Sequence, residues 1–129
     1  YFKAPSGGPL VQHSLPAMLD FWQEGRLSLE KVVEKMCHAP AECFQVDRRG
    51  YIREGYWADL VLFDPEQSWE VRPSNVYYKC GWSPFEEHTF NSKITHTFVN
   101  GNLVYEAEPQ VLNTHFNESV RGMRLKFNR

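Results

Sequence analysis

The sequence has no cluster of basic residues, no long apolar run and few cysteines, and each shortage excludes a class of protein. Its formal net charge is −2 over 129 residues, which argues against a nucleic-acid-binding protein. No apolar run approaches the roughly 20 residues that a membrane-spanning helix needs. We therefore expect neither a nucleic acid nor a membrane as a partner.

The cysteines and histidines do not form a recognisable metal-binding motif. Cys37, Cys43 and Cys80 cannot all pair with one another, and unpaired thiols are typical of a reducing cytoplasm. Cys37 and Cys43 are too far apart for a paired-cysteine zinc site, and the histidines form no His-x-His or i,i+4 pair. We predict a cytoplasmic protein whose cysteines are small buried residues.

The composition suits about one folded domain. Hydrophobic residues make up 42% of the chain and aromatic residues 15%, which is enough to form a core with large side chains. The chain begins Tyr-Phe-Lys, without an initiator methionine or an apolar signal segment. We expect this start to be an internal cut in a longer protein.

The first half of the chain has the periodicity of helices. Apolar residues recur at spacings of three and four from Leu15 to Trp22, which predicts a helix capped by Ser14 and ended at Gly25. A second helix is expected to begin after the N-cap Ser28. We interpret both helices as scaffold. The buried face predicted for the second helix consists of Leu29, Val32, Val33, Met36 and Cys37.

Shorter periods follow the helices. Pro40 is expected to end the second helix and to open a short third one over 41–45. The apolar run 60–63 lies between turn signals, which predicts a strand buried on both faces that ends at Pro65. A brief strand is expected at 69–71. Residues 74–92 are predicted to be an irregular connection with Trp82 and Phe85 as its apolar contacts.

A hairpin is the clearest local feature. The alternating runs 94–99 and 102–106 are separated by Asn100-Gly101, a pair that suits the two positive φ angles of a type I′ turn. His96 within it is expected to be a strand-surface residue. Beyond Pro109 the chain is polar but keeps apolar residues, so we expect it to dock on a surface that can lie outside this sequence.

The first residues form a loop of defined shape. Pro5, Gly7, Gly8 and Pro9 fall within five positions and exclude a regular element. The Gly-Gly pair lets the backbone approach another group closely, either packed protein or a ligand. The residues alone leave both alternatives open.

Taken in order, these segments resemble the C-terminal portion of the dihydroorotases, cyclic amidohydrolases of the metal-dependent amidohydrolase superfamily. The segment 50–64 is similar to that superfamily's Gly-x-Ile-x-x-Gly-x-x-Ala-Asp-Leu signature. Ser83-Pro84-Phe85 narrows the resemblance to the dihydroorotase, allantoinase and dihydropyrimidinase branch. The other matching segments are 5–16, 25–34, 38–44 and 97–105.

The resemblance implies an α/β fold. The chain would be a C-terminal fragment of a (β/α)8 barrel, contributing outer helices, plus part of a small composite β-sandwich domain built from both chain ends. Residues 1–48 would be the last loop and helices of the barrel. Residues 49–108 would be the C-terminal β-sandwich part with the Asn-Gly hairpin, and residues 109–129 a C-terminal docking tail.

The resemblance also implies an activity. It is the zinc-dependent, reversible hydrolysis of the cyclic amide of dihydroorotate to N-carbamoyl-aspartate, a step of de novo pyrimidine synthesis. The implied partners are this small-molecule substrate and the rest of the barrel, and a homodimer is left open. The family's binuclear zinc centre has its ligands in motifs that are absent from these residues. The fragment alone is therefore expected to be inactive.

No catalytic and no metal-binding residue is assigned to this sequence. The resemblance gives a substrate-binding role to Pro5, Ser6 and Gly7, whose counterparts approach the substrate through backbone groups. His13 and His38 differ from the residues usual in the family, and we interpret both as variation of lineage.

Other functions are kept open. An allantoinase- or hydantoinase-type ring opener would share these motifs and would differ upstream, where the substrate carboxylate is held. A metal-free homologue acting as a scaffold would lack intact metal ligands in the segment before Tyr1. A free-standing β-rich binding module would have to cover the apolar faces of its helices by itself.

Overall fold

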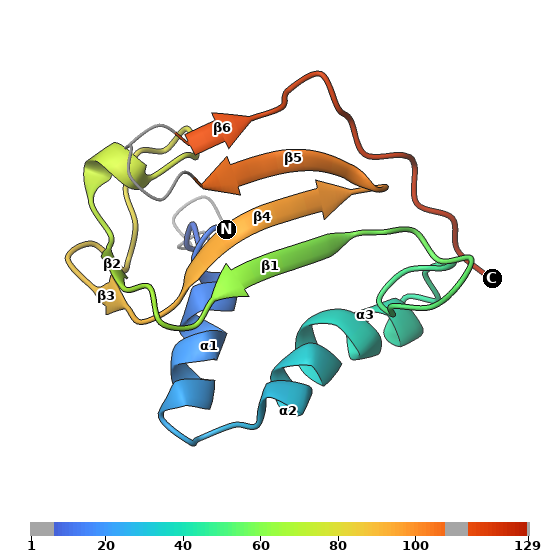
Figure 1. Ribbon diagram of the computed structural model, residues 1–129, viewed down its shortest axis with the longest axis horizontal. Helices are drawn as coiled ribbons and strands as arrows, with labels where there is room; N and C mark the ends of the chain where they lie inside the picture. Colours follow the sequence, from blue (N-terminus) through green and yellow to red (C-terminus); the bar gives the residue numbers. More distant parts are fainter. Residues whose placement is uncertain (1–6, 108–113, 129) are drawn as a thin grey trace, which may run out of the picture.

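The chain is a mixed α/β structure in which helices precede a twisted antiparallel sheet. The computed structural model describes residues 7–107 and 114–128. Four strands form one sheet, and Figure 1 shows α1, α2 and α3 along one side of it. The helical segments are α1 (Ser14–Gln23), α2 (Leu29–Val33), the π-helical turn η1 (Glu34–His38), α3 (Ala39–Cys43) and the 3-10 turn η2 (Pro73–Asn75). The strands are β1 (Leu60–Asp64), β2 (Trp69–Glu70), β3 (Thr89–Phe90), β4 (Lys93–Val99), β5 (Asn102–Ala107) and β6 (Thr114–Phe116).

Helix α1 begins one residue earlier than its sequence predicts. His13 is the N-cap residue, because its carbonyl accepts the first helical bond from Ala17 N at 3.0 Å. The Ser14 hydroxyl, predicted to be the cap, instead donates to Val11 O at 3.1 Å. The predicted end is confirmed, since Gly25 follows the helix with a left-handed φ of 71°.

The second helix starts where predicted but buries less than predicted. The Ser28 hydroxyl accepts from Lys31 N at 3.2 Å, which confirms the cap. Of the five residues expected on its buried face, Val32 is buried, whereas Val33 and Cys37 are exposed. The helical backbone continues from α2 through η1 into α3. Pro40 therefore lies in the first turn of α3 and does not interrupt the helical path of the chain.

The main sheet is antiparallel with the strand order β1-β4-β5-β6. The predicted hairpin is confirmed: β4 and β5 are joined by Asn100 and Gly101, whose φ angles are 51° and 81°. Strand β1 ends at Asp64, directly before Pro65, also as predicted. The expectation that β1 is buried on both faces is wrong, because it is an edge strand whose Val61 and Leu62 are 44% and 49% exposed.

A two-stranded sheet of β2 and β3 contributes to the buried core. Trp69 pairs with Phe90 across it, and both Phe90 and Val71 are 0% exposed. The connection 74–92 is therefore not wholly irregular. Trp82, predicted to be one of its apolar contacts, is 51% exposed, and Phe90 takes that role instead.

The described part of the tail contacts other segments near both of its ends. Strand β6 pairs with β5. Further along, Phe127 forms an isolated bridge with Val46, and Asp47 N donates to Lys126 O at 2.8 Å. Figure 1 shows the tail passing along the edge of the sheet toward α3.

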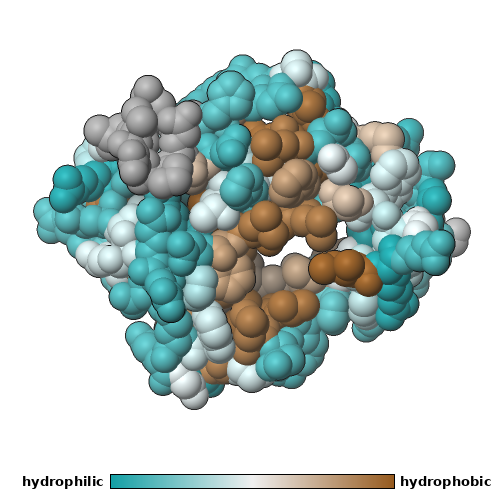
Figure 2. Space-filling view, viewed as in Figure 1, coloured by the Kyte–Doolittle hydropathy of each residue, from teal (hydrophilic) through white to brown (hydrophobic). Residues whose placement is uncertain are grey.

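Much apolar surface remains uncovered in spite of these contacts. Figure 2 shows brown, hydrophobic side chains around a hollow near the centre of one face. Among the described residues, no helix combines the length and the apolar character needed to cross a membrane. The exposed large apolar residues include Leu10, Val11, Phe44, Ile52, Trp57, Tyr77, Phe116, Met123, Leu125 and Phe127.

Gly50 gives a test of how closely the helices and the following turn are packed. It has a φ of 79°, and a Cβ atom placed on it would lie 2.5 Å from Ala41 Cβ and 2.7 Å from Cys37 O. We expect Gly50→Ala to lower the free energy of unfolding by about 3 kcal/mol, from backbone strain and overpacking together. The measurement is urea unfolding of the protein that carries this chain.

Gly55 provides the matched control. Its φ is 80°, but an added Cβ atom would meet nothing within 4 Å. Gly55→Ala should therefore cost about 1 kcal/mol, from the backbone alone. Equal losses for the two variants would contradict the close packing of Gly50 against α3 and η1.

Candidate functional site

The structure describes one of the three residues predicted to bind substrate. Pro5 and Ser6 lie outside the described residues. Gly7 is exposed, and a Cβ atom on it would meet no described atom within 4 Å. Two residues further on, the Pro9 carbonyl accepts a hydrogen bond from the Tyr78 hydroxyl at 3.0 Å. The end of the predicted binding loop is thus attached to a segment about 70 positions away in the sequence.

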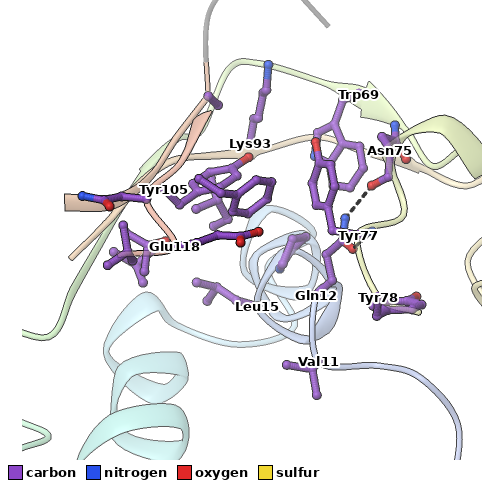
Figure 3. Close-up of a pocket in the computed structure, with 18 of the residues that line it drawn as sticks. Val11, Gln12, Leu15, Trp69, Asn75, Tyr77, Tyr78, Lys93, Tyr105 and Glu118 are labelled. Atoms are coloured by element: carbon purple, nitrogen blue, oxygen red, sulfur yellow. Dashed lines mark hydrogen bonds between the residues drawn. The ribbon is translucent and has the colours of Figure 1, made fainter. Parts of the chain in front are cut away.

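Gln12 makes a second attachment between the same two segments. Its side-chain nitrogen donates to Asn75 O at 2.7 Å, and its side-chain oxygen accepts from Tyr77 N at 2.9 Å. Figure 3 shows Gln12 directed toward Asn75 and Tyr77. Hydrogen bonds therefore join the residues just before α1 to the segment at the end of η2. Each of the two segments contributes both side-chain and backbone groups to these bonds.

His13 is the most deeply buried polar residue beside this loop. Its exposed fraction is 0%, and its ring stacks on Phe90 and Trp69 with centroids 5.8 and 5.9 Å away. Its Nδ1 atom lies 3.1 Å from Ser83 Oγ and 3.3 Å from Tyr78 Oη. The Ser83 hydroxyl also accepts from Phe85 N at 3.1 Å, so the Ser-Pro-Phe motif is attached to α1 through this histidine.

Burial controls the charge of His13. The loss of solvation lowers the pKa of its imidazole from the ordinary 6.5. Its Nε2 atom is buried and has no hydrogen-bond partner among the described residues. The interpretation of His13 as variation of lineage does not predict this buried position. Its partners lie 65 and 70 residues away, where no local pattern relates them.

A second polar contact joins α1 to β3. The buried Asp20 carboxylate accepts from Asn91 N at 3.1 Å and lies 3.2 Å from His88 Nε2. These three residues come from the last turns of α1 and the two ends of β3. Because both carboxylate oxygens are occupied within the fold, we interpret Asp20 as a structural residue.

A cavity lies between the start of α1 and the main sheet. Its volume is about 1100 Å³, and Figure 3 shows Leu15, Trp69 and Tyr105 around it. Burial, and then the charge of Tyr77, raise the pKa of Tyr105 to about 12, so its phenol is neutral. The wall is mostly aliphatic and aromatic, which suits packing against apolar side chains better than acid–base chemistry.

The Ala-Asp-Leu signature has a structural task. The Asp59 carboxylate forms an ion pair with Arg49 Nη1 and accepts from Asn100 N at 2.8 Å. Arg49 also donates to Asn100 Oδ1 at 2.7 Å, and Gly101 N donates to Ala58 O at 2.9 Å. The signature therefore holds the turn of the hairpin against the segment that follows the helices.

The described residues do not fit a metal ion. Across 7–107 and 114–128, no group of three or more His, Cys, Asp or Glu side chains is placed to hold one. His38 instead stacks on Tyr51 with ring centroids 4.1 Å apart.

The prediction that the three cysteines are buried is wrong, since Cys37, Cys43 and Cys80 are all exposed and unpaired.

These features define a mixed α/β chain in which long-range polar contacts fix the segment before α1 and the hairpin turn of the sheet. The model of the amidohydrolase family matches residues 10–104. The chain therefore belongs to the amidohydrolase family, and the predicted resemblance to dihydroorotases is confirmed by its relatives.

Known proteins resemble this chain both in amino-acid sequence and in three-dimensional structure. A dihydroorotase of Halobacterium salinarum is 37% identical over 83% of this chain and 25% of its own length. A dihydroorotase of Clostridium acetobutylicum is 34% identical over 81% of this chain and 24% of its own. The L-hydantoinase (dihydropyrimidinase) of Arthrobacter aurescens superposes with a TM-score of 0.70 at 33% identity, over 80% of this chain and 23% of that structure. A D-hydantoinase superposes with a TM-score of 0.72 at 28% identity, over 78% and 22%. The chain thus spans about a quarter of the length of these relatives.

The Asp59 contacts lead to a prediction for stability. The side chain of Arg49 is 11% exposed, so Asp59→Ala would leave a nearly buried charge without its carboxylate. We expect a loss of about 3 kcal/mol in the free energy of unfolding. The control is Asp47→Ala, which removes a pair with the half-exposed Arg48 and should cost less than about 1 kcal/mol. Similar losses in urea unfolding would contradict the role given to Asp59.

His13 leads to a prediction for pH dependence. Because its folded-state pKa is lowered, the unfolded state binds more protons below pH 6.5. The contribution of His13 to stability should be complete above pH 6.5 and be lost as the pH falls from there through the folded pKa. His13→Phe should reduce the loss between pH 7.5 and 5.5 in urea unfolding. His115→Phe, at an exposed position, should leave that loss unchanged. The same pH dependence in all three proteins would contradict the burial of a neutral His13.

Proposed function

We propose that this chain is the C-terminal portion of a dihydroorotase-type cyclic amidohydrolase. The reaction would be the reversible hydrolysis of dihydroorotate to N-carbamoyl-aspartate. The observation that carries this proposal is the identity of 31–37% to dihydroorotases over about four fifths of the chain. The Ser83-Pro84-Phe85 motif, buried at Ser83 and bonded to His13, supports the same branch of the family.

The proposed architecture assigns three parts to the chain. Residues 1–48 would be the last loop and outer helices of a (β/α)8 barrel, and 49–108 part of a composite β-sandwich. Residues 109–129 would form a docking tail. The exposed apolar residues on α2 and β1 support this, because in a larger protein other segments would cover them. The cavity between α1 and the sheet would be filled in the same way.

The contribution of this chain to catalysis would be to bind and orient substrate. Gly7, with open space around it, would present backbone groups to the ring together with Pro5 and Ser6. Zinc and its ligands would come from outside these residues, because the described side chains do not fit a metal. The exposed, unpaired cysteines support a cytoplasmic enzyme.

A second candidate is a hydantoinase-type ring opener. It is favoured by the two hydantoinase structures, whose TM-scores are 0.72 and 0.70. Both reactions open a cyclic amide, and the two substrates differ in the carboxylate that dihydroorotate carries. Residues of the longer protein that bind this carboxylate would decide between them.

The test is a substrate panel on the full-length protein encoded with this chain. After loading with zinc, we expect hydrolysis of dihydroorotate at least tenfold faster, in kcat/KM, than of hydantoin or allantoin. A chelator should abolish this activity and added zinc should restore it. The matched control is the isolated chain with zinc, which should show no turnover.

Three outcomes would contradict the proposal. Preference for hydantoin or allantoin would favour the second candidate. Absence of turnover on all three rings, in a folded protein that binds no zinc, would favour a scaffold without catalysis. Turnover by the isolated chain would show that the catalytic groups lie within it.

A further inference from the structure

A partly buried hydrogen-bonded relay leads from the Ser-Pro-Phe motif to the predicted binding loop. Ser83 and Tyr78 both contact Nδ1 of His13, at 3.1 and 3.3 Å. Tyr78 in turn bonds the Pro9 carbonyl at 3.0 Å. The aromatic rings of Trp69 and Phe90 stack on His13, so the imidazole is held in one orientation.

The direction of the bond between Tyr78 and Pro9 follows from the chemistry of the two groups. A carbonyl cannot donate, so Tyr78 gives its single hydroxyl proton to Pro9. Toward His13 the Tyr78 oxygen is therefore an acceptor, and it accepts a hydrogen bond from His13 in the tautomer whose Nδ1 carries the proton. The lone pair is then on Nε2, the atom that has no partner in the described part of the chain.

The relay determines where the loop leaves α1. Pro9 is two residues from Gly7, and an extended chain covers at most about 3.6 Å per residue, so Gly7 Cα lies within about 7 Å of the attached residue. Gly7 itself has open space around it. The Tyr78 bond to Pro9 is thus a restraint on the backbone close to Gly7.

We propose that Tyr78, oriented by His13, is a positioning residue for the 7–9 backbone and thereby controls how tightly the enzyme binds its cyclic amide. This inference rests on the proposed function, in which Gly7 contacts substrate through its backbone. Tyr78 acts through Pro9 and does not itself touch the substrate. Its removal should weaken substrate binding more than it slows the chemical step.

The experiment compares the full-length enzyme with its Tyr78→Phe variant, which keeps the ring packed edge-on against His13 and removes the hydroxyl. We expect KM for dihydroorotate to rise about 3- to 10-fold, the effect of one hydrogen bond, with kcat changed less than about twofold. His13→Phe should raise KM similarly, and the double variant no further than either single one. Hydrogen exchange of the peptide 7–12 should be faster in each variant.

The control is Tyr56→Phe, which removes the same atom from a tyrosine that packs against Tyr51 and Arg53. It should leave KM, kcat and the exchange of 7–12 unchanged. A folded Tyr78→Phe enzyme with wild-type KM and wild-type exchange would overturn the inference, as would a fall in kcat alone. If the wild-type enzyme does not hydrolyse dihydroorotate, the proposed function fails, and the exchange of 7–12 still decides whether Tyr78 restrains the loop.

Discussion

The carboxylate of Asp59 is the contact on which the arrangement of the two halves depends. One oxygen pairs with Arg49, which follows the helices, and the other accepts from Asn100 in the hairpin turn. Arg49 reaches the same turn by a second bond to Asn100 Oδ1. Since the guanidinium is nearly buried, these bonds are poorly replaced by water. A short sequence signature thus fixes the sheet relative to the helices.

Features set by neighbouring residues could be predicted from the sequence. The Asn100-Gly101 turn, the Ser28 cap and the end of β1 before Pro65 each follow from backbone preferences within a few residues. The predicted start of α1 is one residue too late. The Ser14 hydroxyl bonds back to Val11, and His13 is the N-cap residue. The local sequence therefore predicts most helices and strands, but it predicts their end residues less accurately.

Features set by distant residues could not be predicted. The relay through His13 joins positions 65 and 70 residues apart, and the burial of Phe90 depends on β2 and on α1. Of the candidate site, Gly7 is described as an exposed glycine with open space, and its role stays a prediction. No periodicity could have indicated that Tyr78 holds Pro9, because neither residue lies in a regular element.

In the proposed enzyme, the exposed strand β1 and the polar relay at the loop would have different structural roles. Apolar burial contributes roughly 25 cal/mol per Å², so Val61 and Leu62, half-exposed here, would add stability once other segments cover them. The relay at His13 is already complete, apart from Nε2, within the described residues. Hydrogen bonds formed within one segment keep these residues in place when apolar surfaces around them are joined. In the proposed enzyme, this chain would therefore bring a preformed 7–9 backbone to an active site whose metal and catalytic groups come from other segments.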